Sequence, residues 1–185
     1  MTSKLSNIKS SIGRYVFERK LNHLTRNKRL INLNDAKSVV IVYNVINQDL
    51  FTQIKLLVKE LTTRNRQVMA LGFVNRNSIP NYCVAANSGY YFDLKDLNWF
   101  GAPKNDYIKE FIKKEFDILI DLTLEDNFVT QFIAGLSRSK FKVGRYSPNH
   151  EQYYDLMIDI KKNSTIEEFI ENVIHYLLVL KPRQA

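Results

Sequence analysis

The sequence alternates between short β-branched apolar runs and segments with helical periodicity. Three runs are almost continuously apolar: residues 38–45 (SVVIVYNV), 67–74 (QVMALGFV) and 116–122 (FDILIDL). A strand that is apolar at nearly every position is buried on both faces, as in a parallel sheet covered by helices. Weaker runs predict further short strands at residues 82–86, 90–94, 141–144 and 156–160.

Helical segments separate these strands. Apolar residues recur at helical spacing in four sets: Leu50, Ile54, Leu57, Val58 and Leu61; Ile108, Phe111 and Ile112; Phe128, Phe132, Ile133 and Leu136; and Ile166, Phe169, Ile170, Val173, Ile174, Leu177 and Leu178. Ser164 and Glu167 fit a capping box at the start of the last of these segments. Alternation of strand and helix at this spacing indicates βαβ units. We therefore predict a single three-layer α/β domain with a mostly parallel, Rossmann-like sheet over residues 35–185.

The net charge of +8 is concentrated near the N-terminus. Residues 1–34 contain eight Lys or Arg and one acid, a net charge of +7, whereas the rest of the chain has 19 bases and 18 acids. Leu5, Ile8, Ile12 and Val16 recur at helical spacing in this segment. We therefore expect a separate basic amphipathic helix over residues 1–34. Such charge asymmetry favours an anionic partner.

This basic segment predicts a non-catalytic binding or adaptor protein. RNA or a ribonucleoprotein is the expected partner, because bases that neutralise phosphates release condensed counterions. The expected contacts are Arg14, Arg19, Lys20, Arg26, Lys28 and Arg29. In the alternative interpretation these bases form a solvated helix face, and the apolar stripe docks on the sheet or on a second chain.

Polar residues follow the predicted strands. In open parallel sheets, ligands bind beyond the carboxyl ends of the strands. The residues at those ends are Asn44, Asn47, Asn75, Arg76, Asp121, Thr123 and Arg145. They predict, as an alternative function, an enzyme or sensor with a small-molecule site around Asn44, Asp121 and Arg145. Asn, Asp and Thr are also favoured at these positions for helix capping and turns.

The chain has no sequence signature of a cofactor. The first predicted strand is followed by NVINQDL rather than Gly-x-Gly-x-x-Gly, and neither a phosphate-binding P-loop nor a Gly-x-Ser-x-Gly elbow is present. The three histidines are scattered, so we expect no metal site. Cys83 has apolar neighbours, which predicts a buried, inert thiol. His150 lies in a polar stretch, SPNHEQ, and is expected to be exposed, with acid–base work as the alternative.

The sequence predicts a cytoplasmic protein. No apolar run approaches the roughly 20 residues of a membrane-spanning helix. Lys4, Lys9 and Arg14 interrupt the apolar stretches at the N-terminus, which argues against a secretory signal. The single cysteine is compatible with a reducing compartment.

Residues 116–147 resemble part of the N-terminal domain of heptosyltransferase-like glycosyltransferases. The parallels are FDILIDLT (116–123), AGLS (134–137) and KVG (142–144). The resemblance implies a Rossmann-like domain related to the half that holds the sugar acceptor. Those enzymes have a glycine-bearing loop after their first strand, whereas this chain has NVINQD there. They also hold the nucleotide-sugar donor in a second Rossmann-like domain, whereas this sequence predicts one such domain. The resemblance therefore implies a relic of the acceptor half.

The chain as a whole is similar to a small bacterial family of α/β proteins of unknown function. The similarity is carried by the basic N-terminal segment, KDLNWFG (95–101), FDILIDLT, and IEEFIENVIHYLLVLK (166–181). It implies the same architecture and assigns no activity.

Overall fold

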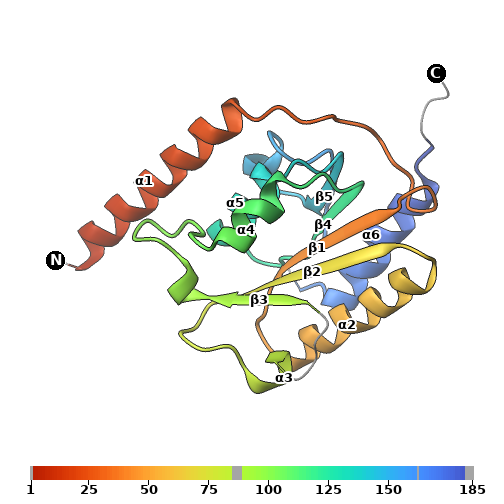
Figure 1. Ribbon diagram of the computed structural model, residues 1–185, viewed down its shortest axis with the longest axis horizontal. Coiled ribbons are helices and arrows are strands. Elements are labelled where there is room, and N and C mark those ends of the chain that lie inside the picture. The colour runs from red at the N-terminus through yellow and green to blue at the C-terminus, as the bar shows by residue number, and fades with distance from the viewer. Residues whose placement is uncertain (1, 85–88, 162, 182–185) are drawn as a thin grey trace.

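Parallel strands form one sheet at the centre of the computed structural model, which describes residues 2–84, 89–161 and 163–181 (Figure 1). Within these residues the sheet has six strands in the order β3-β2-β1-β4-β5-β6, all paired in parallel. The strands are β1 (Ser38–Asn44), β2 (Gln67–Val74), β3 (Tyr90–Asp93), β4 (Ile118–Asp121), β5 (Phe141–Arg145) and β6 (Leu156–Ile158). The strand order reverses between β1 and β4, which is the Rossmann arrangement and confirms the predicted fold class.

Helices cover both faces of this sheet and complete three layers (Figure 1). One face packs against α2 (Gln48–Thr63) and α6 (Ile166–Val179). The other face packs against α1 (Thr2–Asn22), α4 (Asp106–Lys113) and α5 (Phe128–Leu136). The remaining elements are the short helix α3 (Asn81–Val84) and the 3₁₀ turns η1 (Leu94–Asp96) and η2 (Pro148–His150).

The apolar run of β1 follows from the packing of helices on both faces of the sheet. Successive strand residues point to opposite faces of a sheet. Val39, Ile41 and Tyr43 therefore join the core beneath α2 and α6, whereas Val40 and Val42 join the core beneath α4 and α5. All five side chains are at most 1% exposed.

Two local predictions are wrong. The strand predicted at 82–86 is helical up to Val84, because the Pro80 carbonyl accepts the amides of Cys83 and Val84; residues 85 and 86 lie outside the described residues. The capping box of α6 uses Thr165 and Glu168 rather than Ser164 and Glu167. Both pairs have the required spacing, so the sequence did not distinguish the two registers.

The N-terminal helix is shorter than the predicted 1–34 unit, because α1 ends at Asn22. The following residues run extended along the domain: the Arg29 amide donates to the Lys140 carbonyl, and the Leu33 amide donates to the Leu177 carbonyl. The Asn32 side chain donates to the carbonyls of Leu178 and Leu180 at the end of α6. Terminal helix carbonyls lack partners within their own helix, and this capping favours an extended path.

Helix α1 packs on its own domain through Phe17. The Phe17 side chain is 2% exposed, and its ring centroid lies 5.8 Å from that of Phe132 and 5.7 Å from that of Tyr153. The close approach requires a glycine at position 135, since a Cβ atom there would lie 2.5 Å from the Phe17 ring. The buried line of α1 therefore runs through Gly13 and Phe17, while Ile8, on the predicted stripe, is 55% exposed. The side chain of Leu5 lies outside the described part.

We predict that Phe17→Ala destabilises the whole domain. Removing a buried phenylalanine costs about 3 kcal/mol or more, which corresponds to a fall in Tm of about 10 °C for a chain of this size. Thermal unfolding followed by circular dichroism measures the change. Tyr15→Ala is the control, because Tyr15 is 65% exposed on the same helix. Equal Tm values for the two variants would show that α1 is not docked in solution.

Candidate functional site

The polar residues after β1 and β2 have separate local roles. The Asn47 side chain accepts the Leu50 amide at 2.9 Å and caps α2. The side-chain oxygen of Asn44 is buried without a hydrogen-bond partner. The main chain of Arg76 bonds Val74 and Leu94, and its side chain is exposed. Asn75 is exposed and lines a pocket described below.

The polar residues after β4 and β5 converge into one cluster, with Asp121 buried and the pair of Arg145 and Asp126 nearer the surface. Asp121 accepts hydrogen bonds from the Tyr154 hydroxyl at 2.5 Å and from the Thr123 amide at 2.9 Å. Arg145 pairs with Asp126 at 2.8 Å. The space enclosed by this cluster is about 10 Å³, which is about the room that one water needs. The structure thus brings Asp121, Thr123 and Arg145 together but leaves no room among them for a substrate.

His150 belongs to the same cluster and is buried, contrary to the expected exposed histidine. Its Nε2 atom lies 3.1 Å from the Gln131 side-chain nitrogen and 3.6 Å from the Asp126 carboxylate. The ring packs beside Tyr153 and Tyr154. The polar sequence around His150 concealed this burial, because it comes from η2 folding back onto α5.

Burial shifts the pKa values of Asp121 and Tyr154. Burial raises the pKa of the Asp121 carboxyl, and its hydrogen bonds from Thr123 and Tyr154 oppose that shift. Burial and the neighbouring Asp121 raise the pKa of Tyr154 well above its usual value. A carboxyl with a raised pKa in the folded state contributes less stability as the pH rises through that pKa.

We predict that Asp121→Asn lowers Tm less than Asp121→Ala at pH 8, because its amide oxygen can accept from Thr123 and its NH2 group can donate to the Tyr154 hydroxyl oxygen. Asp121→Ala leaves the Tyr154 hydroxyl unpaired, which costs about 2 kcal/mol and lowers Tm by about 6 °C. Differential scanning calorimetry distinguishes the two variants. A lower Tm for the Asn variant than for the Ala variant would contradict this account.

The basic residues near the N-terminus fall into two groups. Arg26 is used structurally: its guanidinium contacts Asp155 at 2.6 Å and donates to the Lys140 carbonyl at 3.0 Å. Lys28 lies 3.3 Å from the same carboxylate. The second group has exposed side chains, which extend from α1 or from the segment that follows it. Its members are Arg14, Arg19, Lys20 and Arg29.

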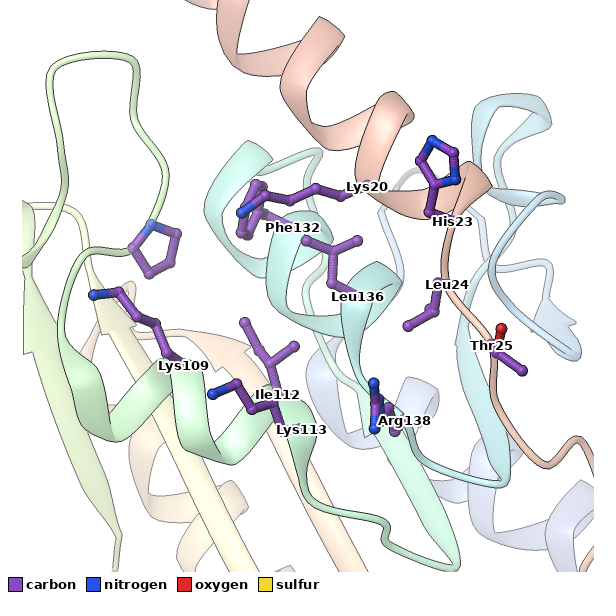
Figure 2. A pocket seen from close by; sticks show the side chains of 11 residues that line it. Lys20, His23, Leu24, Thr25, Lys109, Ile112, Lys113, Phe132, Leu136 and Arg138 are labelled. Carbon is purple, nitrogen blue, oxygen red and sulfur yellow. The ribbon is translucent and has the colours of Figure 1, made fainter.

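A groove lies between α1 and α4, above α5 (Figure 2). We call it the basic groove; its volume is about 350 Å³. Its rim consists of Lys20, His23, Lys109, Lys113 and Arg138, and its floor includes Ile112, Phe132 and Leu136. No carboxylate is among the described residues that line it.

Lys20 and the lysines of α4 differ in their partners. Lys20 reaches over the Phe132 ring, with its Nζ atom 5.5 Å from the ring centroid (Figure 2). Lys109 pairs with Asp106 and Lys113 pairs with Glu110, each at 2.7 Å within α4. These two pairs are solvent-exposed, and such pairs contribute little energy. A stronger anion can therefore compete for both ammonium groups.

A second and larger space, which we call the strand-end pocket, lies beside the first half of α1. Its volume is about 560 Å³, and it is bordered by Lys9, Arg14, Asn75, Trp99 and Phe128. The loop carrying Phe100 separates it from the basic groove, since the Phe100 carbonyl touches α1 at Gly13. The two spaces therefore lie along the same helix.

The sequence interpretation missed Lys142. This lysine of β5 is 0% exposed, and its Nζ atom donates to the Gly135 carbonyl near the end of α5 at 2.7 Å. The pKa of Lys142 is lowered to about 7, mainly by burial and also by the neighbouring Arg26 and Lys28, while Asp155 opposes the shift. A lysine in the middle of the short strand FKVGR was the available signal.

The lowered pKa of Lys142 makes stability depend on pH. Between pH 7 and 10.5 the unfolded chain binds a proton that folded Lys142 lacks, so stability rises with pH. We predict that the free energy of unfolding of the wild type, relative to Lys142→Met, increases by about 2 kcal/mol from pH 7 to pH 9. Urea unfolding at several pH values measures it. Parallel pH profiles would show that Lys142 titrates normally.

Other chemical features of the site are limited. Among the residues that the structure describes, no three His, Cys, Asp or Glu side chains are grouped to hold a metal ion. The same residues contain no helix with the length and apolar character needed to cross a bilayer. Cys83 is buried as predicted, and burial raises the pKa of its thiol to about 11.

Comparison with known proteins places the chain in a family. The model of a family of unknown function (DUF6913) matches residues 9–180. No curated protein matches the chain. One similar solved structure is heptosyltransferase WaaC of E. coli with ADP, with a TM-score of 0.47 and 13% identity over 80% of this chain and 49% of that chain. The chain thus spans about half the length of that enzyme. The family match agrees with the similarity of the whole chain to a family of unknown function. Because the family model covers nearly the whole chain, the protein belongs to this family of unknown function.

Proposed function

We propose that the protein is a non-catalytic RNA-binding protein that holds a single strand in the basic groove. The observation that carries the proposal is the convergence of cationic side chains from α1, α4 and the end of α5 on one groove whose described lining has no carboxylate. Lys20, Lys113 and Arg138 represent these three elements. Each base that neutralises a phosphate contributes affinity through counterion release.

The shape of the groove favours a single strand. Proteins that bind single-stranded nucleic acid combine a positively charged groove with aromatic or apolar surface for the bases. The partly exposed Ile112 supplies apolar surface at the floor, above the buried Phe132 and Leu136, and Lys20 lies beside it. A single strand can turn its bases toward this floor, whereas the paired bases of a duplex cannot reach it.

The strand ends support a binding role rather than catalysis. The polar cluster around Asp121 is internally hydrogen bonded and encloses about 10 Å³. Its Asp121, Tyr154 and His150 side chains hold β4, β5 and η2 together. Their burial and hydrogen bonds are therefore explained by a structural role.

The test is a salt titration of binding to a short single-stranded RNA, followed by fluorescence anisotropy. We expect the wild-type affinity to fall steeply between about 50 and 200 mM salt. The double variant Lys20→Glu/Arg138→Glu should bind at least about tenfold more weakly at low salt. It should also lose about 0.7 from the log–log slope for each phosphate contact removed. Truncation is a poorer test, because it would remove Phe17 from the core.

The matched control is Lys55→Glu/Lys59→Glu on α2, at the opposite face of the sheet. Lys55 lies over the Phe51 ring at 5.7 Å, much as Lys20 lies over Phe132, and Lys59 is exposed. This control carries the same charge change and should retain most of the wild-type affinity. Equal losses in both double variants would indicate non-specific attraction, and absence of binding at low salt would refute the proposal.

A further inference from the structure

The strand-end pocket is distinct from the basic groove and has the dimensions of a small-molecule site. Its volume of about 560 Å³ falls within the range of ligand pockets, roughly 300–1,000 Å³. The end of β2, the loop before α4, and the starts of α1 and α5 all border it. It therefore lies at the carboxyl edge of the sheet, where open α/β folds bind ligands.

The charge of this pocket is positive. Lys9 and Arg14 border it from α1, and no carboxylate is among its described lining residues. The acids of the neighbouring η1 turn are engaged within that turn: Asp93 accepts the Lys95 amide, and Asp96 accepts the Asp93 amide. The two cations are therefore not neutralised by that turn. An arginine guanidinium matches the geometry of phosphate oxygens.

The pocket also has an exposed aromatic face. Trp99 is 60% exposed at its border, and its ring is held edge to face against Phe100 with the centroids 5.3 Å apart. An indole fixed in this way offers a flat surface to a planar ligand. Stacking of a nucleobase on an aromatic side chain contributes about 1–3 kcal/mol.

We infer that the strand-end pocket binds a nucleoside phosphate, with the phosphate on Arg14 and Lys9 and the base on Trp99. The pocket is large enough for both parts, and the two cations and the indole border the same space. Asn75, at the end of β2, adds an exposed amide at the border for polar groups of the ligand. This inference does not depend on RNA binding in the basic groove.

The test uses AMP, with adenosine and inorganic phosphate as its two halves. Trp99 is the only tryptophan of the chain, so its fluorescence reports directly on the pocket. We expect AMP to change the Trp99 emission in a saturable manner, and each half to bind at least about tenfold more weakly. Isothermal titration calorimetry measures the same affinities in variants that lack the indole.

Arg14→Gln and Trp99→Ala should each raise the Kd for AMP about tenfold, whereas Arg19→Gln should leave it unchanged. Arg19 is a matched control, because it is exposed on the same helix and does not border the pocket. Unchanged Tm values exclude unfolding as the cause. Absence of AMP binding by both methods would overturn the inference, as would equal affinity for phosphate alone or equal effects of the two arginine variants.

One variant tests RNA binding in the basic groove separately from nucleotide binding in the strand-end pocket. Lys20→Glu/Arg138→Glu should retain AMP binding, because neither residue borders the strand-end pocket. Loss of AMP binding in that variant with an unchanged Tm would place the nucleotide in the basic groove and overturn the assignment to Arg14 and Trp99.

Discussion

The contact between Phe17 and Gly135 is the interaction on which the arrangement of this protein depends. The phenylalanine of α1 fits against α5 only because residue 135 has no side chain. The contact fixes a basic helix across one face of the domain. Without it, the wall shared by the basic groove and the strand-end pocket would be absent, and the positive charges of α1 would have no fixed geometry.

Docking of α1 also divides the positively charged side chains of the N-terminal segment into structural and accessible ones. Buried charges need partners, since an unpaired buried ion is costly. Arg26 meets this requirement through Asp155 and two main-chain carbonyls. The cations that remain accessible, including Arg14 and Lys20, lie on the parts of α1 that border open space. The charge available to a partner is therefore smaller and more localised than the net charge of the segment implies.

The crevice that Rossmann-like folds use for ligands is partly filled here. Tyr154 enters from the segment after η2 and donates to Asp121 at the end of β4. This fills the space beyond the ends of β4 and β5, on one side of the switch point between β1 and β4. Open volume is found instead toward the ends of β2 and β3, where α1 and the Trp99 loop form its walls. The position of the pocket thus follows from two segments outside the sheet.

The sequence by itself determined the parallel α/β architecture and the order along the chain of its six strands and of α2, α4, α5 and α6, but it wrongly predicted a strand at 82–86. Apolar runs such as residues 38–45 reflect burial on both faces of the sheet. Caps such as Asn47 depend on neighbours within a few residues. Both features can therefore be recognised from short stretches of sequence. Only the tertiary structure decided that His150 is buried, that the Lys142 ammonium lies against the Gly135 carbonyl of α5, and that Lys20 and Arg138 line one groove. These relations join residues far apart in the chain, and they depend on how α1 and η2 fold back onto α5, which no local periodicity encodes.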